Sequence, residues 1–216
     1  MESTAKWRKR FTSSLKENSM TTLIILITAI LSFAGFSNRD IIEKYKFNPF
    51  RIKRNKEWHR WISYGFIHAD MNHLIFNMLS LYFAGQYCEL IFTPAPSYIL
   101  FYLSAIVVSG IADYHDHKNN PYYSAVGASG AVNAVLFSLV LFEPWGKVDI
   151  FMILPMPFIV FAILYLAYSW YMAKRNGDNI GHLAHISGAI YGIIATIIYV
   201  PNALQTFLVR IIHPSF

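Results

Sequence analysis

The charged side chains of this 216-residue chain are gathered in short segments, and six long intervals contain no Asp, Glu, Lys or Arg. The intervals are 18–38, 71–88, 90–112, 119–142, 150–173 and 179–209. A helix that crosses the hydrocarbon core of a bilayer needs about 20 mostly apolar residues, and its backbone hydrogen bonds are satisfied internally. The intervals therefore predict an all-α membrane protein with six transmembrane helices.

Composition argues against an ordinary soluble domain. Charged residues make up 14% of the chain, whereas a typical soluble domain has roughly 25%. A soluble bundle of long helices would also show polar faces with a 3.6-residue period, and the stretch 22–30 has no such face. The bases before the first interval also fit a cleaved signal peptide, but the uncharged run is long for a signal, so a retained helix is favoured.

We predict one compact domain over residues 20–200, between a basic N-terminal tail at 1–19 and a short C-terminal tail at 201–216. The longest polar segment, 39–70, mixes Trp and Tyr with Lys and Arg, a mixture that prefers the headgroup level of a bilayer. We interpret this segment as an interfacial loop. Its bases lie beside a lipid bilayer and no nucleic-acid-binding motif accompanies them, so nucleic acid is not an expected partner.

Polar residues in or beside the apolar intervals are candidates for chemistry, because polar groups are costly in a hydrocarbon slab. The first cluster is His68, His73 and Asn77. His73 and Asn77 are four residues apart, so they share a helix face on which both side chains can donate hydrogen bonds to a common point. Taken alone, such a pair is also typical of hydrogen bonding between membrane helices.

The second cluster is the sequence Gly127-Ala128-Ser129-Gly130 at the head of the fourth interval's apolar run. Glycines on both sides of a serine let the backbone turn sharply, let another helix approach closely, and leave the hydroxyl unobstructed. Taken alone, small residues in a membrane helix usually serve packing.

The third cluster lies in the sixth interval. Gly188 and Gly192 form a GxxxG strip for close helix contact, and His185 lies about one turn before Gly188 on the same face. A hydroxyl nucleophile needs a base within hydrogen-bond reach and donors for the oxyanion that it creates, and the three clusters supply one part each. No acidic residue lies within the six intervals, and Asp178 is in a predicted loop, so a Ser129/His185 dyad is the chemistry that fits.

The ordered set HxxxxHxxxN, GxSG and HxxGxxxG, running from His68 to Gly192, resembles the rhomboid family of intramembrane serine proteases. The resemblance covers nearly all of the predicted core. It implies a six-helix rhomboid-like bundle with a long interfacial first loop. It also implies an endopeptidase without metal or cofactor that cleaves transmembrane segments of single-pass membrane proteins.

The resemblance implies roles for individual residues. Ser129 corresponds to the nucleophile and His185 to its base, while His73 and Asn77, with the Ser129 backbone amide, correspond to the oxyanion donors. Other matching positions are expected to support the fold or the site. These are Arg60, Glu89, His68, Gly127, Gly130, Gly188 and Gly192.

The chain departs from the family pattern at two places. The family often places Trp directly before the arginine that Arg60 matches, whereas here the order is Trp58-His59-Arg60-Trp61. Four residues after the nucleophile, some rhomboids carry a tyrosine that stacks on the histidine, whereas here the residue is Asn133. We therefore expect another group to hold the base.

Two other functions are alternatives. Spaced histidine pairs would suit a membrane metal enzyme with histidine boxes. The pairs are His68/His73, His115/His117 and His182/His185. Such enzymes typically have adjacent His-His pairs, and this chain has none; the HExxH motif of zinc proteases is missing too. The second alternative, an inactive rhomboid relative that binds membrane clients, would typically lack the serine or the histidine.

The distribution of Lys and Arg conflicts with the resemblance over orientation. With six spans, the side that carries both termini has seven of these residues and the other side has eleven, which would place both termini outside. The resemblance implies cytoplasmic termini, most simply in a bacterial inner membrane. We follow it, because the bases of 39–70 lie in the interface and the first helix, preceded by five bases, usually dominates.

Overall fold

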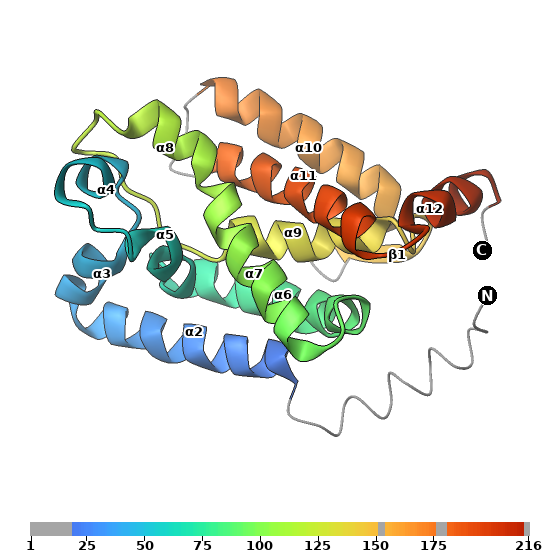
Figure 1. Cartoon of the computed structure of the whole chain (residues 1–216), viewed down its shortest axis with the longest axis horizontal. Helices are drawn as coiled ribbons and strands as arrows, with labels where there is room; N and C mark the ends of the chain where they lie inside the picture. The colour runs from blue at the N-terminus through green and yellow to red at the C-terminus, as the bar shows by residue number, and fades with distance from the viewer. Residues whose placement is uncertain (1–18, 151–153, 176–180, 214–216) are drawn as a thin grey trace.

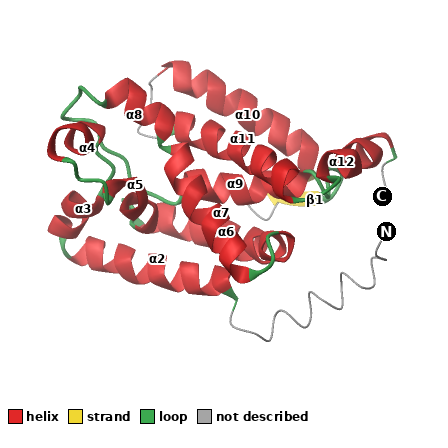
Figure 2. Ribbon diagram, viewed as in Figure 1, coloured by secondary structure: helices red, strands yellow, loops and turns green. Residues whose placement is uncertain are grey.

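The computed structural model describes residues 19–150, 154–175 and 181–213. These residues form a bundle of helices with one short two-stranded sheet (Figures 1 and 2). The prediction of a helical membrane protein is therefore confirmed. Residues 1–18 of the predicted basic tail, and the loop residue Asp178, lie outside the described residues.

The described residues form fourteen helices and strands. In chain order they are α2 (Met20–Ser37), α3 (Arg39–Tyr45), α4 (Pro49–Asn55), α5 (Arg60–Ser63), η1 (Tyr64–Phe66), α6 (Met71–Ile91), α7 (Ala95–Ser109), α8 (Ile111–His117), α9 (Ser129–Val140), β1 (Lys147–Ile150), β2 (Leu154–Pro157), α10 (Phe158–Arg175), α11 (His182–Tyr199) and α12 (Ala203–Ile212).

Four helical segments among the described residues are long and apolar enough to cross a membrane. They are α2, α6, the continuous segment Ala95–His117 that contains α7 and α8, and α11. The other two predicted intervals fall on α9 and α10. Helix α9 has only 12 residues, because residues 119–128 of its interval form a loop. Helix α10 has 18 residues but ends in Lys174 and Arg175, which lower its mean hydropathy.

Helix α9 lies in the middle of the bundle, where it packs against α6, α7, α10 and α11 (Figure 1). It is nearly surrounded by protein, and its buried side chains are mostly apolar. A 12-residue helix is about 18 Å long, much shorter than the roughly 30 Å hydrocarbon core. A helix of this length can begin within the bundle, at Ser129, without reaching either end of the bundle.

The interfacial segment 39–70 folds into α3, α4, α5 and η1. Asn38 and Asn48 precede α3 and α4, and their side-chain oxygens accept hydrogen bonds from the backbone N–H groups of Asp40 and Arg51, both at 2.9 Å. Asn is among the preferred residues at a helix N-cap for this reason. The two caps mark where α3 and α4 begin, so the segment consists of short helices rather than one long helix.

Arg60, buried under this segment, makes hydrogen bonds to several of its residues. Its side chain is 2% exposed, and a buried charge is tolerated only when it is paired and hydrogen-bonded. Its Nε donates to Glu57 Oε2 at 2.5 Å, and its guanidinium also donates to the carbonyls of Glu43 and Lys46 at 3.0 and 2.7 Å. Arg60 thus joins α3 to α5.

Glu89 holds the N-terminus of α2 against the far end of α6. Its carboxylate accepts hydrogen bonds from the backbone N–H groups of Met20 and Thr21, at 2.9 and 3.2 Å, and from the Ser19 hydroxyl at 2.6 Å. The first N–H groups of a helix lack partners within the helix, and a negative charge there also complements the helix dipole. Glu89 therefore fixes how α2 is placed on α6.

The structure adds two elements beyond the predicted spans. Strands β1 and β2 pair in antiparallel register, with Lys147 opposite Pro157, so α10 begins at Phe158 rather than near residue 150. The predicted C-terminal tail contains helix α12. Trp145 Nε1 donates to the Arg210 carbonyl at 3.1 Å, which ties this helix to the residues just before β1.

Candidate active site

Ser129 and His185 lie in direct contact at the centre of the bundle. Ser129 is the first residue of α9 and His185 lies in the first turn of α11. The distance from His185 Nε2 to Ser129 Oγ is 2.8 Å, well within hydrogen-bond range. Both side chains are only partly buried, so a group that enters the site can reach them. A serine hydroxyl beside an imidazole nitrogen has the geometry that base-assisted nucleophilic attack requires.

Glycines bring the two helices close enough for this contact. A Cβ added to Gly188 would lie 2.0 Å from the carbonyl oxygen of Gly130, and one added to Gly192 would lie 2.2 Å from that of Ala134. Only glycine therefore fits at these two positions of α11, with its backbone resting on the backbone of α9. Gly130 is equally enclosed, because its Cβ would lie 2.3 Å from Ser109 Oγ.

The turn before Ser129 is shaped by Gly127 and His73. Gly127 has a φ of 119°, a conformation that other residues rarely adopt, and an added Cβ would lie 2.5 Å from His73 Cε1. The imidazole of His73 therefore lies against the backbone two residues before Ser129. At the start of α6, Asp70 Oδ1 accepts a hydrogen bond from the His73 backbone N–H at 2.9 Å, which fixes where this helix begins.

Asn77 lies one turn after His73 on α6 and is buried. Its Nδ2 donates to the His73 carbonyl at 2.9 Å. The amide group has a second N–H, so one donor is used within the helix and the other can serve a second acceptor. His73 thus lies beside the turn that leads to Ser129. Asn77 lies one turn further along α6 and is hydrogen-bonded to the His73 carbonyl.

His68 supports the same turn. It is completely buried, its Nε2 accepts a hydrogen bond from the Ala128 backbone N–H at 3.3 Å, and its Nδ1 lies 3.0 Å from Ser32 Oγ. Burial lowers the pKa of His68 to about 3, with a smaller effect from His73, so the ring stays neutral and can accept through Nε2 while Nδ1 carries the proton. His68 therefore connects α2 to the residue before the nucleophile.

The interfacial segment also holds the loop that leads to Ser129, a contact that the sequence motifs did not reveal. Phe47 and Ala125 exchange two backbone hydrogen bonds, of 2.9 and 3.1 Å, and the Gly127 N–H donates to the Tyr64 carbonyl at 2.9 Å. These contacts are backbone hydrogen bonds between segments far apart in the sequence, so no side-chain pattern predicts them. They make the interfacial segment a structural part of the site.

Tyr165 of α10 is the second feature that sequence reasoning missed. Its ring is stacked on the His185 imidazole, with centroids 6.2 Å apart and an interplanar angle of 26°. The Tyr165 hydroxyl accepts a hydrogen bond from Asn133 Nδ2 at 2.8 Å. Asn133, where some rhomboids have the stacking tyrosine, thus contacts a tyrosine supplied by another helix.

Among the described residues, no group of three or more His, Cys, Asp or Glu side chains is placed to hold a metal ion. The histidines of the predicted pairs make other contacts. His68 and His73 pack edge to face at 4.9 Å, His182 and His185 at 6.0 Å, and His117 stacks on Tyr123.

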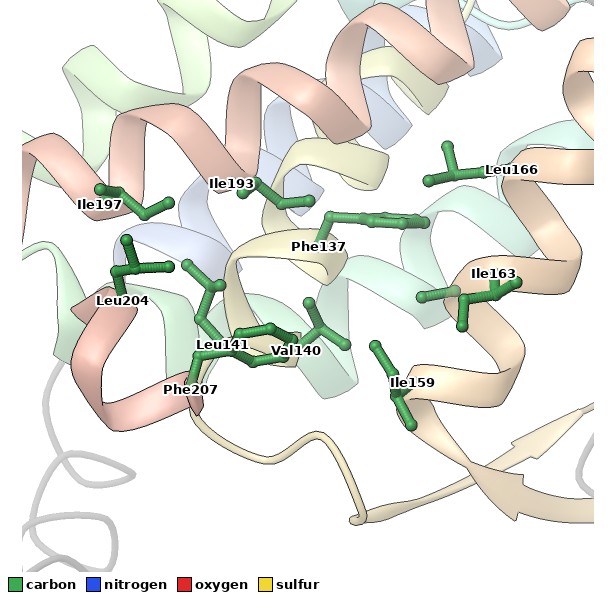
Figure 3. Close-up of a pocket in the computed structure, with 11 residues that line it drawn as sticks. Phe137, Val140, Leu141, Ile159, Ile163, Leu166, Ile193, Ile197, Leu204 and Phe207 are labelled. Atoms are coloured by element: carbon green, nitrogen blue, oxygen red, sulfur yellow. The ribbon is translucent and has the colours of Figure 1, made fainter. Parts of the chain in front are cut away.

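A separate cavity of about 200 Å³ lies between α9, α10, α11 and α12 (Figure 3). Its lining is entirely apolar and includes Phe137, Ile163, Ile193 and Leu204. Ser129 and His185 do not line it, so the cavity is distinct from the site.

The fold and the site define a multi-pass helical membrane protein with a serine and a histidine in hydrogen-bond contact inside the bundle. Comparison with known proteins gives the family. The model of the Rhomboid domain matches residues 55–202, well over half of the chain. The chain therefore belongs to the rhomboid family, as the motifs predicted.

Individual relatives agree with this membership. The chain is 27% identical over 169 residues to Rhomboid-related protein 1 of Caenorhabditis elegans, covering 74% of this chain and 45% of that protein. It is 26% identical over 182 residues to Rhomboid protease GluP of Bacillus subtilis (strain 168), covering 82% and 34%. It is 26% identical over 185 residues to Rhomboid protease GlpG of Haemophilus influenzae, covering 83% and 91%. The chain thus spans a half or less of the first two relatives and nearly all of the third.

Proposed function

We propose that this chain is an intramembrane serine endopeptidase in which Ser129 attacks the scissile carbonyl and His185 takes its proton, then delivers a proton to the leaving amine. The observation that carries the proposal is the 2.8 Å contact between His185 Nε2 and Ser129 Oγ. The retained dyad favours an active protease over an inactive client-binding relative. We assign no metal or cofactor to the reaction.

The proposed membrane arrangement has six spans: the four long helical segments together with α9 and α10. Helix α9 need not reach both surfaces by itself, because it is enclosed by four other helices and its leading loop is covered by the interfacial segment. Helix α10, with Lys174 and Arg175 at its end, can extend these long side chains to the interface while its other residues remain in the hydrocarbon.

The proposed substrates are single-pass membrane proteins cut near the outer end of their spanning helix at a small residue. A helix keeps its carbonyls in i to i+4 hydrogen bonds, so the substrate must unwind locally before Ser129 can attack. Gly disfavours a helix by about 1 kcal/mol and Pro by about 3 kcal/mol relative to Ala, so either residue raises the extended population several-fold or more.

The test is a series of purified single-pass substrates in proteoliposomes. Changing Gly or Pro just after the cut to Leu should lower the cleavage rate about fivefold or more. Changing the residue before the cut from Ala to Phe should also slow cleavage. Equal rates across the whole series would refute both the unwinding requirement and the preference for a small residue.

The proposed oxyanion donors are His73, Asn77 and the Ser129 amide. Removing one donor from an oxyanion site costs about 100- to 1000-fold in turnover, so His73→Ala and Asn77→Ala should each fall in this range and remain more active than a dyad variant. Asn72→Ala is the control, because Asn72 is the exposed neighbour of His73. If neither variant loses turnover, both residues act only in packing.

The proposed location is a cell membrane, in bacteria the inner membrane, with both termini in the cytoplasm. Cysteine labelling of intact cells tests the orientation. Cys88 is buried, and Tyr122, in the loop before Ser129, is 93% exposed. A membrane-impermeant maleimide should label Tyr122→Cys and leave Ser3→Cys unlabelled. The reverse pattern would place the termini outside.

A further inference from the structure

The base of the proposed dyad must keep Nε2 directed at Ser129, and the structure shows what restrains its ring. The torsion between an aliphatic carbon and an imidazole ring is broad, so it does not fix the ring by itself. The Tyr165 ring lies nearly parallel to that of His185, at 26° and a centroid distance of 6.2 Å. The distance is within the range of offset-stacked aromatic pairs.

Tyr165 is itself held from three sides. Asn133 Nδ2 donates to its hydroxyl at 2.8 Å, Phe161 stacks on its ring at 5.6 Å, and Phe137 packs against it at 6.0 Å. Asn133 is 5% exposed and lies on α9 one turn after Ser129, so it shares the helix face of Ser129. The hydroxyl of Tyr165 is thus tied to the helix that carries Ser129, and its ring contacts the helix that carries His185.

We propose that Tyr165, anchored by Asn133, is a positioning residue that helps to hold His185 in line with Ser129. This inference rests on the proposed protease function. It goes beyond that function by assigning the alignment of the base to α10, a helix that contributes neither Ser129 nor His185. The face of a tyrosine ring also attracts a cation, so the contact should strengthen when His185 takes the proton of Ser129 during acylation.

The alignment of the base then depends on the packing of three helices. Ser129 and Asn133 are on α9, His185 is on α11 and Tyr165 is on α10. A displacement of α10 away from the other two would remove the ring from His185 without touching either member of the dyad.

The test measures kcat and KM of the full chain in proteoliposomes with one fluorogenic transmembrane peptide, together with the thermal unfolding midpoint. Tyr165→Leu should lower kcat about tenfold with KM nearly unchanged, because loss of stacking and of the cation contact affects the base rather than substrate binding. Tyr165→Phe should recover most of this loss, because it keeps the ring. The matched control is Tyr168→Leu, which removes a tyrosine of the same helix that contacts His182 instead; its kcat should equal that of the wild type.

A double-mutant cycle tests the anchor. Tyr165→Phe and Asn133→Ala break the same hydrogen bond, so the double variant should lose no more kcat than the more impaired single variant. If Tyr165→Leu does not fold, the Phe variant and this cycle still decide the question. Full kcat in Tyr165→Leu, equal losses in Leu and Phe variants, or additive effects in the cycle would overturn the positioning role. A wild-type protein that does not cleave, or a Ser129→Ala protein that does, would instead overturn the proposed function.

Discussion

Replacing Ser129 or His185 by alanine should lower cleavage of a model transmembrane substrate by about four powers of ten or more. The two residues share one proton across the 2.8 Å contact between Ser129 Oγ and His185 Nε2, so neither can act without the other. For the same reason, the double variant should be no slower than the slower single variant, because residues that act as a unit are strongly non-additive. The measurement is the initial rate of cleavage in proteoliposomes over several decades of enzyme concentration.

The controls remove the same side-chain types from exposed positions. Ser124 lies five residues before Ser129, in the loop that leads to α9, and His115 lies on α8. Ser124→Ala and His115→Gln should keep the wild-type rate. Cleavage that survives in both Ser129→Ala and His185→Ala would rule out the dyad.

Adding one methyl group at Gly188 should have the next largest effect. In Gly188→Ala the new Cβ would lie 2.0 Å from the Gly130 carbonyl oxygen, and a backbone atom cannot move aside as a side chain can. The helices α9 and α11 must then separate, which costs about 1 to 3 kcal/mol in overpacking. A displacement of about 1 Å between reacting groups can lower turnover about 100-fold. We expect a loss of activity of this size together with a lower midpoint of thermal unfolding.

Gly181→Ala is the matched control, at the N-cap of the same helix. Its Cβ would lie 3.7 Å from the nearest atom, an ordinary contact, and Gly181 has a negative φ of −74° that alanine can adopt. This variant should keep wild-type activity and stability. A Gly188→Ala protein with the same turnover and unfolding midpoint as the wild type would show that close approach of α9 and α11 does not set the geometry of the site.

The apolar intervals and short motifs predicted the membrane class and the family correctly, because both depend on local features of the chain. Burial of polar groups in hydrocarbon is so costly that the charge-free intervals mark the helices. The GxxxG strip at Gly188 and Gly192 indicated a close helix contact, and the structure shows that contact with α9. The role of Ser129 and His185 stays a proposal, which their direct contact supports.

Two contacts between distant segments were not predicted. The backbone bridge between Phe47 and Ala125 has no side-chain signature. Tyr165 looked like one more aromatic residue in an apolar helix, because nothing local shows that its ring faces His185. The lengths of α9 and α10 also differ from their intervals, since an uncharged stretch can contain a loop or a strand before the helix begins. One feature of the sequence did point to such a contact. Asn133 stands where some rhomboids carry the tyrosine that stacks on the histidine, so we expected another group to hold the base.

Covalent labelling with a fluorophosphonate tests the nucleophile most directly, because this reagent reports an activated serine without requiring knowledge of the substrate. The purified chain should take up one label, and peptide mass spectrometry should locate it on Ser129. His185→Ala should abolish labelling although Ser129 is intact, since the hydroxyl loses its base. Labelling at another serine, or labelling of Ser129 that persists at the wild-type rate in His185→Ala, would contradict a Ser129/His185 dyad.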